Sequence, residues 1–105
     1  MLAKLGQSEL LKRRPRYQLE CNSINLSVPI FPGTTLTIGS HSSDSILVSE
    51  KDIKPKHVQL KLLEDSSELG INALLGQVES RVELGTSVFR LIPSQIEFVI
   101  KALGQ

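Results

Sequence analysis

The sequence predicts an all-β protein built as one antiparallel β-sandwich behind a short leader. Apolar residues alternate with polar ones along most of residues 16–105, which is the pattern of strands that bury one face. Turn signals made of Gly, Pro, Asn and Ser separate these runs at spacings of roughly 8–12 residues. No helical period appears after residue 15. The 105 residues suit a single domain with a modest core.

Residues 1–15 differ from the rest of the chain and form a basic leader. Their leucines fit either a short, weakly amphipathic helix or a disordered segment, and the sequence leaves both open. Pro15 disfavours helical geometry at Arg14, so any helix is expected to end there. We therefore divide the chain into a basic leader, 1–15, and a sandwich domain, 16–105.

The first two predicted strands form a hairpin. Apolar side chains alternate over residues 17–21 and again over 24–30, with a tight turn expected at Asn22-Ser23. Pro29 has no N–H to donate to a neighbouring strand. The second strand is therefore expected to lie at a sheet edge or to be finishing there.

Further strands are predicted along the rest of the chain. Pro32-Gly33 is a turn signal before the next strand. A continuous apolar run at 46–48 is consistent with a short buried strand, because a polar loop precedes it and a charged loop follows it. The expected strands cover residues 34–38, 46–48, 58–62, 69–73, 78–84, 87–92 and 96–100.

Charge is distributed unevenly along the chain. Residues 1–16 carry five basic residues and one acidic residue, whereas the rest carries seven basic and ten acidic residues. The body therefore lacks the basic stripe of a nucleic-acid binder, and no nucleic-acid partner is expected. The basic cluster at 12–16 fits a contact with anionic lipid or nucleic acid, an acidic partner, or simply a solvated leader, which is the commonest case. No apolar run reaches the roughly 18 residues of a membrane span, and no signal peptide is expected.

The sequence carries no catalytic or metal-binding motif. It lacks a Gly-x-Ser-x-Gly nucleophile motif, and His41, His57 and Cys21 show no spacing typical of metal ligands. We therefore expect no enzymatic activity, no metal and no cofactor. Cys21, the only cysteine, excludes an internal disulfide, is compatible with a reducing compartment and is predicted to be a small core residue. His57 is predicted to be structural, with one ring nitrogen bonded to the loop backbone near 39–45.

The segment from Leu36 to Leu62 resembles the centre of a forkhead-associated (FHA) domain. Thr37-Ile38-Gly39 matches the strand that ends in Gly-Arg, Asp44 precedes a short Ile/Val strand, and His57 precedes an alternating strand. The resemblance implies an FHA-like sandwich. Phosphothreonine-reading members supply phosphate contacts from an Arg after the Gly and from a Ser and an Arg before the His. Those three positions are here Ser40, Lys54 and Pro55, so a competent phosphate site is not expected.

The variant motif resembles the cytoplasmic N-terminal domain of the type III secretion inner-membrane ring protein family, in which Gly-Ser and Pro-x-His replace the usual pairs. This resemblance implies a non-catalytic scaffold at the cytoplasmic face of the bacterial inner membrane, with a membrane span outside this chain. Its implied partners are cytoplasmic sorting-platform proteins of the secretion apparatus, and copies of itself in a ring formed by the full-length protein. The alternative is a phosphothreonine-peptide-binding FHA signalling module.

The candidate docking residues lie on the two loops that flank the short central strand. If the resemblance holds, loops 40–45 and 51–57 meet at one end of the sandwich, where recognition by loops on a rigid scaffold is common. Ordinary surface lysines are an equally open interpretation. The candidate partner-docking residues are Ser40, His41, Ser43, Lys51, Lys54 and Lys56, and the structural motif consists of Gly39, Asp44, Pro55 and His57.

Overall fold

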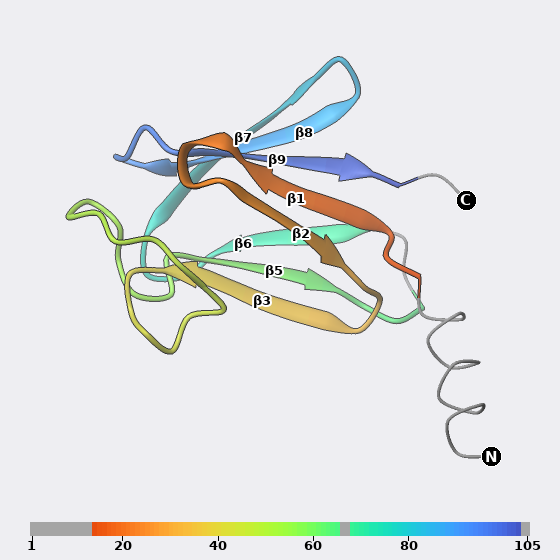
Figure 1. Ribbon diagram of the computed structural model, residues 1–105, viewed down its shortest axis with the longest axis horizontal. Helices are drawn as coiled ribbons and strands as arrows, with labels where there is room; N and C mark the ends of the chain where they lie inside the picture. Colours follow the sequence, from red (N-terminus) through yellow and green to blue (C-terminus); the bar gives the residue numbers. More distant parts are fainter. Residues whose placement is uncertain (1–13, 66–67, 104–105) are drawn as a thin grey trace.

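The computed structural model describes residues 14–65 and 68–103 and confirms the all-β architecture (Figure 1). Residues 1–13 of the predicted leader, 1–15, lie outside the described residues, and with them the helix or disordered segment expected there. The strands are β1 (Tyr17–Cys21), β2 (Leu26–Ile30), β3 (Thr34–Gly39), β4 (Ile46–Leu47), β5 (Val58–Leu62), β6 (Leu69–Ala73), β7 (Gln77–Glu83), β8 (Thr86–Ile92) and β9 (Glu97–Ala102).

The strands form two sheets. One has five strands in the order β2-β1-β9-β8-β7, and the other has four in the order β4-β3-β5-β6. The pairs are antiparallel except for β3 and β4, which run parallel with Ile38 opposite Ile46. The prediction of a purely antiparallel sandwich is therefore wrong at this pair. Loop 40–45 returns the chain from the end of β3 to a position beside Ile38. β4 therefore runs next to β3 in the same direction.

The predicted hairpin is confirmed, but its turn is longer than expected. A short 3₁₀-helix, η1 (Asn22–Ile24), follows β1, and Asn25 then takes a left-handed conformation with φ of 53°. Asn tolerates this conformation better than most residues, and it lets the chain reverse. β2 consequently starts at Leu26, two residues later than the alternation predicted. β2 is an edge strand, as Pro29 predicted.

The core lies between the two sheets and is built from the alternating apolar residues. Phe89 and Phe98 are opposite each other on β8 and β9, and their rings stack with centroids 5.1 Å apart. Cys21 is buried in the same apolar cluster, which confirms its predicted place in the core. The other fully buried members include Leu19, Ile30, Ile38, Val48, Val58, Leu60, Leu62 and Leu91.

The two ends of the sandwich carry different parts of the chain (Figure 1). The β1–β2 connection, the loops around β4 and the β8–β9 turn lie at one end. The start of β1 and the end of β9 lie at the other, where the Leu103 N–H donates to the Arg16 carbonyl oxygen at 2.9 Å. Within the described part of the chain, no helix has the length and apolar character needed to cross a membrane.

Truncation of a buried phenylalanine should lower the free energy of unfolding more than truncation of an exposed one. Phe98 is fully buried, so Phe98→Ala is expected to lower the free energy of unfolding by about 3–5 kcal/mol. Phe31 is 37% exposed, and Phe31→Ala is the matched control with an expected loss below about 1.5 kcal/mol. Urea denaturation followed by circular dichroism measures both. Equal losses would contradict this placement of the core.

Candidate functional site

The ends of β3 and β5 bring the predicted site loops together. Because the two strands are antiparallel, the residues after Gly39 meet the residues before Val58. The Ser40 N–H donates to the Lys54 carbonyl oxygen at 3.2 Å, and the His57 N–H donates to the Ile38 carbonyl oxygen at 2.9 Å. We call the surface formed by residues 40–45, 48–57 and 74–76 the loop end.

Asp44 ties the first loop to the second. Its side chain is buried and accepts backbone N–H bonds from His41 at 3.1 Å and from Lys56 at 3.2 Å. Burial raises the pKa of Asp44, but the hydrogen bonds from Lys56, His41 and the Thr37 side chain together lower it below its ordinary value of 3.8. The carboxylate is therefore ionised at neutral pH and acts as a structural acceptor.

Gly39 allows this close contact. A Cβ atom at position 39 would overlap the Asp44 Oδ2 atom and the Lys56 backbone nitrogen. No other residue leaves room for the carboxylate at this point. The Gly39 and Asp44 motif positions therefore serve one contact between the loops.

His57 ties the second loop to the β6–β7 connection. The ring is fully buried, with Nδ1 3.1 Å from the Lys54 nitrogen and Nε2 2.8 Å from the Gln77 carbonyl oxygen. Because the Lys54 N–H donates to Nδ1, we assign the proton to Nε2, which donates to Gln77 in a neutral imidazole. A Cβ atom at position 76 would overlap the ring, so the imidazole fits here only because residue 76 is a glycine.

The predicted partner of His57 was wrong. Its ring nitrogens bond to residues 54 and 77 and not to the backbone of 39–45. The ring points toward the start of β7, where the chain crosses to the five-stranded sheet. Asp44 takes the role that the sequence assigned to the histidine, which is to hold loop 40–45.

A third contact joins the loop end to the other sheet. The Ser94 hydroxyl lies 3.4 Å from Glu50 Oε1 and accepts the Ile96 N–H at 3.1 Å. Ser94 is buried in the β8–β9 turn. The loop that follows β4 is therefore bonded to both sheets, which limits its freedom to move.

The predicted docking residues all lie on the loop end, in different settings. Ser40 is half-buried, and His41, Ser43, Lys51, Lys54 and Lys56 are exposed. His41 turns toward its own loop, because its Nδ1 accepts the Ser43 N–H at 3.0 Å and lies 2.7 Å from the Ser43 hydroxyl.

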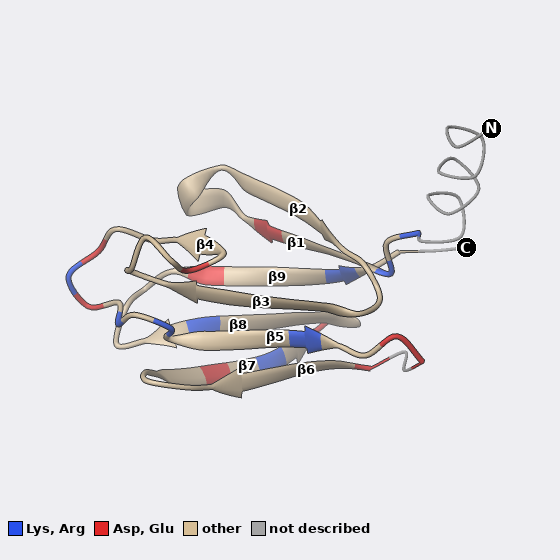
Figure 2. Cartoon of the chain, turned by 90° about the horizontal axis from the view of Figure 1, so that it is seen from below, with Lys and Arg blue, Asp and Glu red and all other residues tan. Residues whose placement is uncertain are grey.

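The lysines differ in the charges around them. Figure 2 shows the charged outer loop, where acidic Glu50 and Asp52 flank Lys51. Lys54 and Lys56 flank the exposed Pro55 and have no acidic neighbour in sequence.

The structure adds two apolar residues that the sequence analysis did not single out. Leu74 and Leu75 are 44% and 63% exposed on the β6–β7 connection. The Leu75 N–H donates to the Lys56 carbonyl oxygen at 3.0 Å, so these leucines lie beside the lysine loop. The signal in the sequence was an apolar pair directly before Gly76, where the alternation of the preceding strand had ended.

Most backbone donors of the loop end are already used. Lys54 donates its N–H to His57, Lys56 donates to Asp44, and Pro55 has none. In loop 40–45, the N–H groups of Ser40, His41, Ser43, Asp44 and Ser45 all have partners within the protein. The side chains of Lys54 and Lys56 are the basic groups that this part of the site offers to a ligand.

No group of three or more His, Cys, Asp or Glu residues that could hold a metal occurs among the residues that the structure describes. Comparisons with protein-family models, with curated proteins and with solved structures found no match. The relation to the type III secretion ring family is therefore still a prediction from residues 36–62.

The Asp44 contact makes stability depend on pH. Asp44→Asn is expected to lower the free energy of unfolding at pH 7 by about 1–3 kcal/mol, because an amide cannot accept with both groups. The pKa of Asp44 is lower in the folded state, so its contribution is present above about pH 4 and is lost as pH falls through that lower value. Denaturant titrations at pH 7 and near pH 3 should show the variant approaching the parent in acid. Asp52→Asn, on the exposed neighbouring loop, is the control, and an equal effect from it would contradict the assignment.

Gly76→Ala tests the packing of the His57 ring against residue 76. The added methyl group overlaps the His57 ring, so the free energy of unfolding should fall by about 1–3 kcal/mol or more. Gly70→Ala is the matched control on the neighbouring strand, because its methyl group meets nothing closer than the Lys61 carbonyl oxygen at 3.6 Å. Thermal unfolding compares the two variants. A neutral Gly76→Ala would overturn the packing described for His57.

Proposed function

We propose that this chain is a non-catalytic interaction scaffold, the cytoplasmic domain of an inner-membrane ring component of a bacterial type III secretion system, and that its loop end docks soluble sorting components. The supporting observation is the division of roles on the loop end. Asp44 and His57 use their polar atoms to fix the loops, while Lys54, Lys56 and Leu75 are left on the outside. Docking by loops held on a rigid body needs this combination.

The exposed groups favour an acidic partner with an apolar contact. Within the described residues, neither Lys54 nor Lys56 forms an ion pair, so both ammonium groups are available to a partner. Leu74 and Leu75 lie beside them and offer apolar area. An apolar centre with charges at its rim is the usual composition of a transient protein interface.

The orientation of the domain supports the same role. The loop end lies opposite the end of β9 (Figure 1), so a tether that follows the domain would leave the loops pointing away from the membrane. Copies arranged in a ring would present many such surfaces at once. Weak single contacts then add up to firm docking through avidity.

The alternative phosphothreonine reader has less support from the same loops. A dianionic phosphate needs several donors at fixed positions. The backbone N–H groups at 54 and 56 are bonded to His57 and Asp44, and position 40 holds a serine. Two flexible lysine side chains would have to supply most of the contacts.

A titration can test the docking surface. We expect purified soluble sorting-platform proteins to shift the amide resonances of 40–57 and 74–76 in the ¹⁵N-labelled domain. The double variant Lys54→Glu/Lys56→Glu should weaken binding at least about tenfold, since each lost or reversed charge contact contributes on the order of 1 kcal/mol. Leu75→Ser should weaken it through lost apolar contact.

Lys61→Glu is the matched control, because Lys61 is exposed on the outer face of β5 and away from the loop end. Equal weakening by Lys61→Glu would contradict a docking site on these loops. A phosphothreonine peptide library provides the competing arm. Saturable shifts at 39–57 that vanish with the unphosphorylated peptides would favour the signalling module and overturn the scaffold proposal.

A further inference from the structure

The outer edge of β6 is open to another strand. β6 pairs with β5 on one side, and no strand of the described chain pairs with it on the other. The Leu74 N–H donates to the His57 carbonyl oxygen, toward β5. In an antiparallel pair the direction alternates, so the N–H and C=O groups of Leu69, Ile71 and Ala73 point outward.

The other sheet edges are protected against strand addition, and this one is not. Pro29 interrupts β2, and β4 has only two residues. β7 carries charged residues along its length, with Arg81 bonded to Glu83 and Glu97. Charged side chains, proline and short length are the means by which edge strands avoid pairing. β6 reads Leu-Gly-Ile-Asn-Ala and has none of these.

We propose that this edge pairs with β6 of a second copy of the chain, in an antiparallel arrangement centred on Ile71. Ile71 then lies opposite Ile71, Leu69 opposite Ala73 and Gly70 opposite Asn72. No like charges face each other, because β6 carries no charged residue. The outward-pointing groups of 69, 71 and 73 fall opposite one another, as an antiparallel ladder requires.

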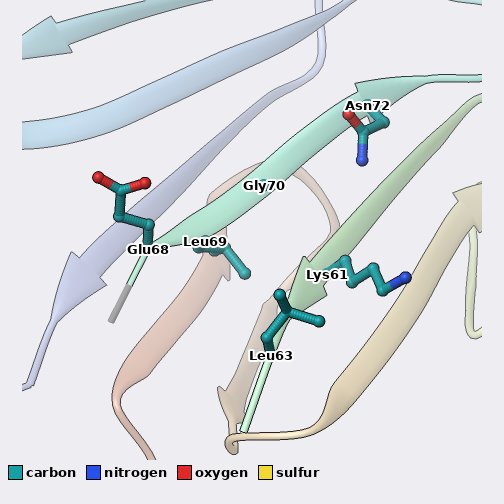
Figure 3. A pocket seen from close by; sticks show the side chains of 6 residues that line it. All are labelled: Lys61, Leu63, Glu68, Leu69, Gly70 and Asn72. Carbon is teal, nitrogen blue, oxygen red and sulfur yellow. The ribbon is translucent and has the colours of Figure 1, made fainter. Parts of the chain in front are cut away.

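The side chains of the two copies also fit in size. On the inner face, Leu69 and Ile71 of one copy meet Ala73 and Ile71 of the other and extend the apolar layer. On the outer face, a hollow of about 310 Å³ lies over Gly70, which has no side chain to fill it (Figure 3). Asn72 of the second copy lies directly opposite Gly70 in this register and enters the hollow. The hollow is lined by residues of one copy, with Asn72 at its far end: Lys61, Leu63, Glu68, Leu69, Gly70 and Asn72.

The occupant is a second copy and not a charged peptide, because the edge is uncharged and complementary to itself. The affinity of the pair is low, since one five-residue strand from each copy buries less than the roughly 1,200 Å² of a standard stable interface. The pairing uses other residues than the proposed docking at the loop end. Because the two β6 strands run antiparallel, the loop ends of the two copies lie at opposite ends of the pair, so we propose this contact for the free chain in solution and not between neighbouring copies in a ring.

A concentration series of the whole chain tests the inference. Between about 0.05 and 1 mM, the amide resonances of residues 69–73 should shift, and the mass from sedimentation should rise toward a dimer. Isotope-filtered spectra of a mixed sample should show contacts between Leu69 of one copy and Ala73 of the other. A mass that stays monomeric over this range overturns the proposal.

Ala73→Lys places a charge on the open edge, at an exposed position, and should lower the association constant at least about tenfold. Ser80→Lys adds the same charge to the exposed edge strand β7 and should leave association unchanged. Unaltered core resonances in both variants establish that each is folded. Loss of association in Ser80→Lys alone, or shifts at 69–73 that arise only with an added foreign peptide, would overturn pairing between copies.

Discussion

The carboxylate of Asp44 joins two loops that have no regular structure of their own, and the rest of the loop end depends on this contact. It accepts the backbone N–H groups of His41 and Lys56 and can approach them only because position 39 is a glycine. Once the loops are joined, the His57 ring can reach both Lys54 and Gln77. Two buried polar side chains thus satisfy the backbone of three connections, which would otherwise be left without partners in the protein interior.

This arrangement separates stability from recognition. The apolar core between the sheets and the buried pair Asp44 and His57 determine the fold, and neither group presents a reactive atom to solvent. The exposed residues of the loop end can therefore change without disturbing the core. The sheet edges also differ in what they allow. Pro29 in β2 and the charged residues of β7 restrict pairing with a further strand, whereas the edge of β6 is open.

The sequence predicted most of the strands because period-two alternation reports directly which face is buried. It could not give the direction of β4, since a continuous apolar run such as 46–48 indicates burial and says nothing about the neighbour. It also could not place His57, whose partner Gln77 is 20 residues away across a change of sheet. The docking residues were predicted from their position on the loops around the short strand, and this reasoning did not include Leu74 and Leu75, which lie between the predicted strands 69–73 and 78–84. Whether the loops bind a sorting component depends on a partner surface that one chain does not contain.

The position of β9 has a mechanical consequence. Its neighbours β1 and β8 are both antiparallel to it, and its last residues lie at the end of the sandwich opposite the loops. A pull between Leu103 and the loop end acts along β9 and loads its hydrogen bonds together, in shear. A pull between the start of β1 and the end of β9 would instead separate the pair Tyr17 and Ala102 first. The following pairs of these two strands would then separate one after another. The domain therefore resists tension along one axis far better than separation of its two chain ends.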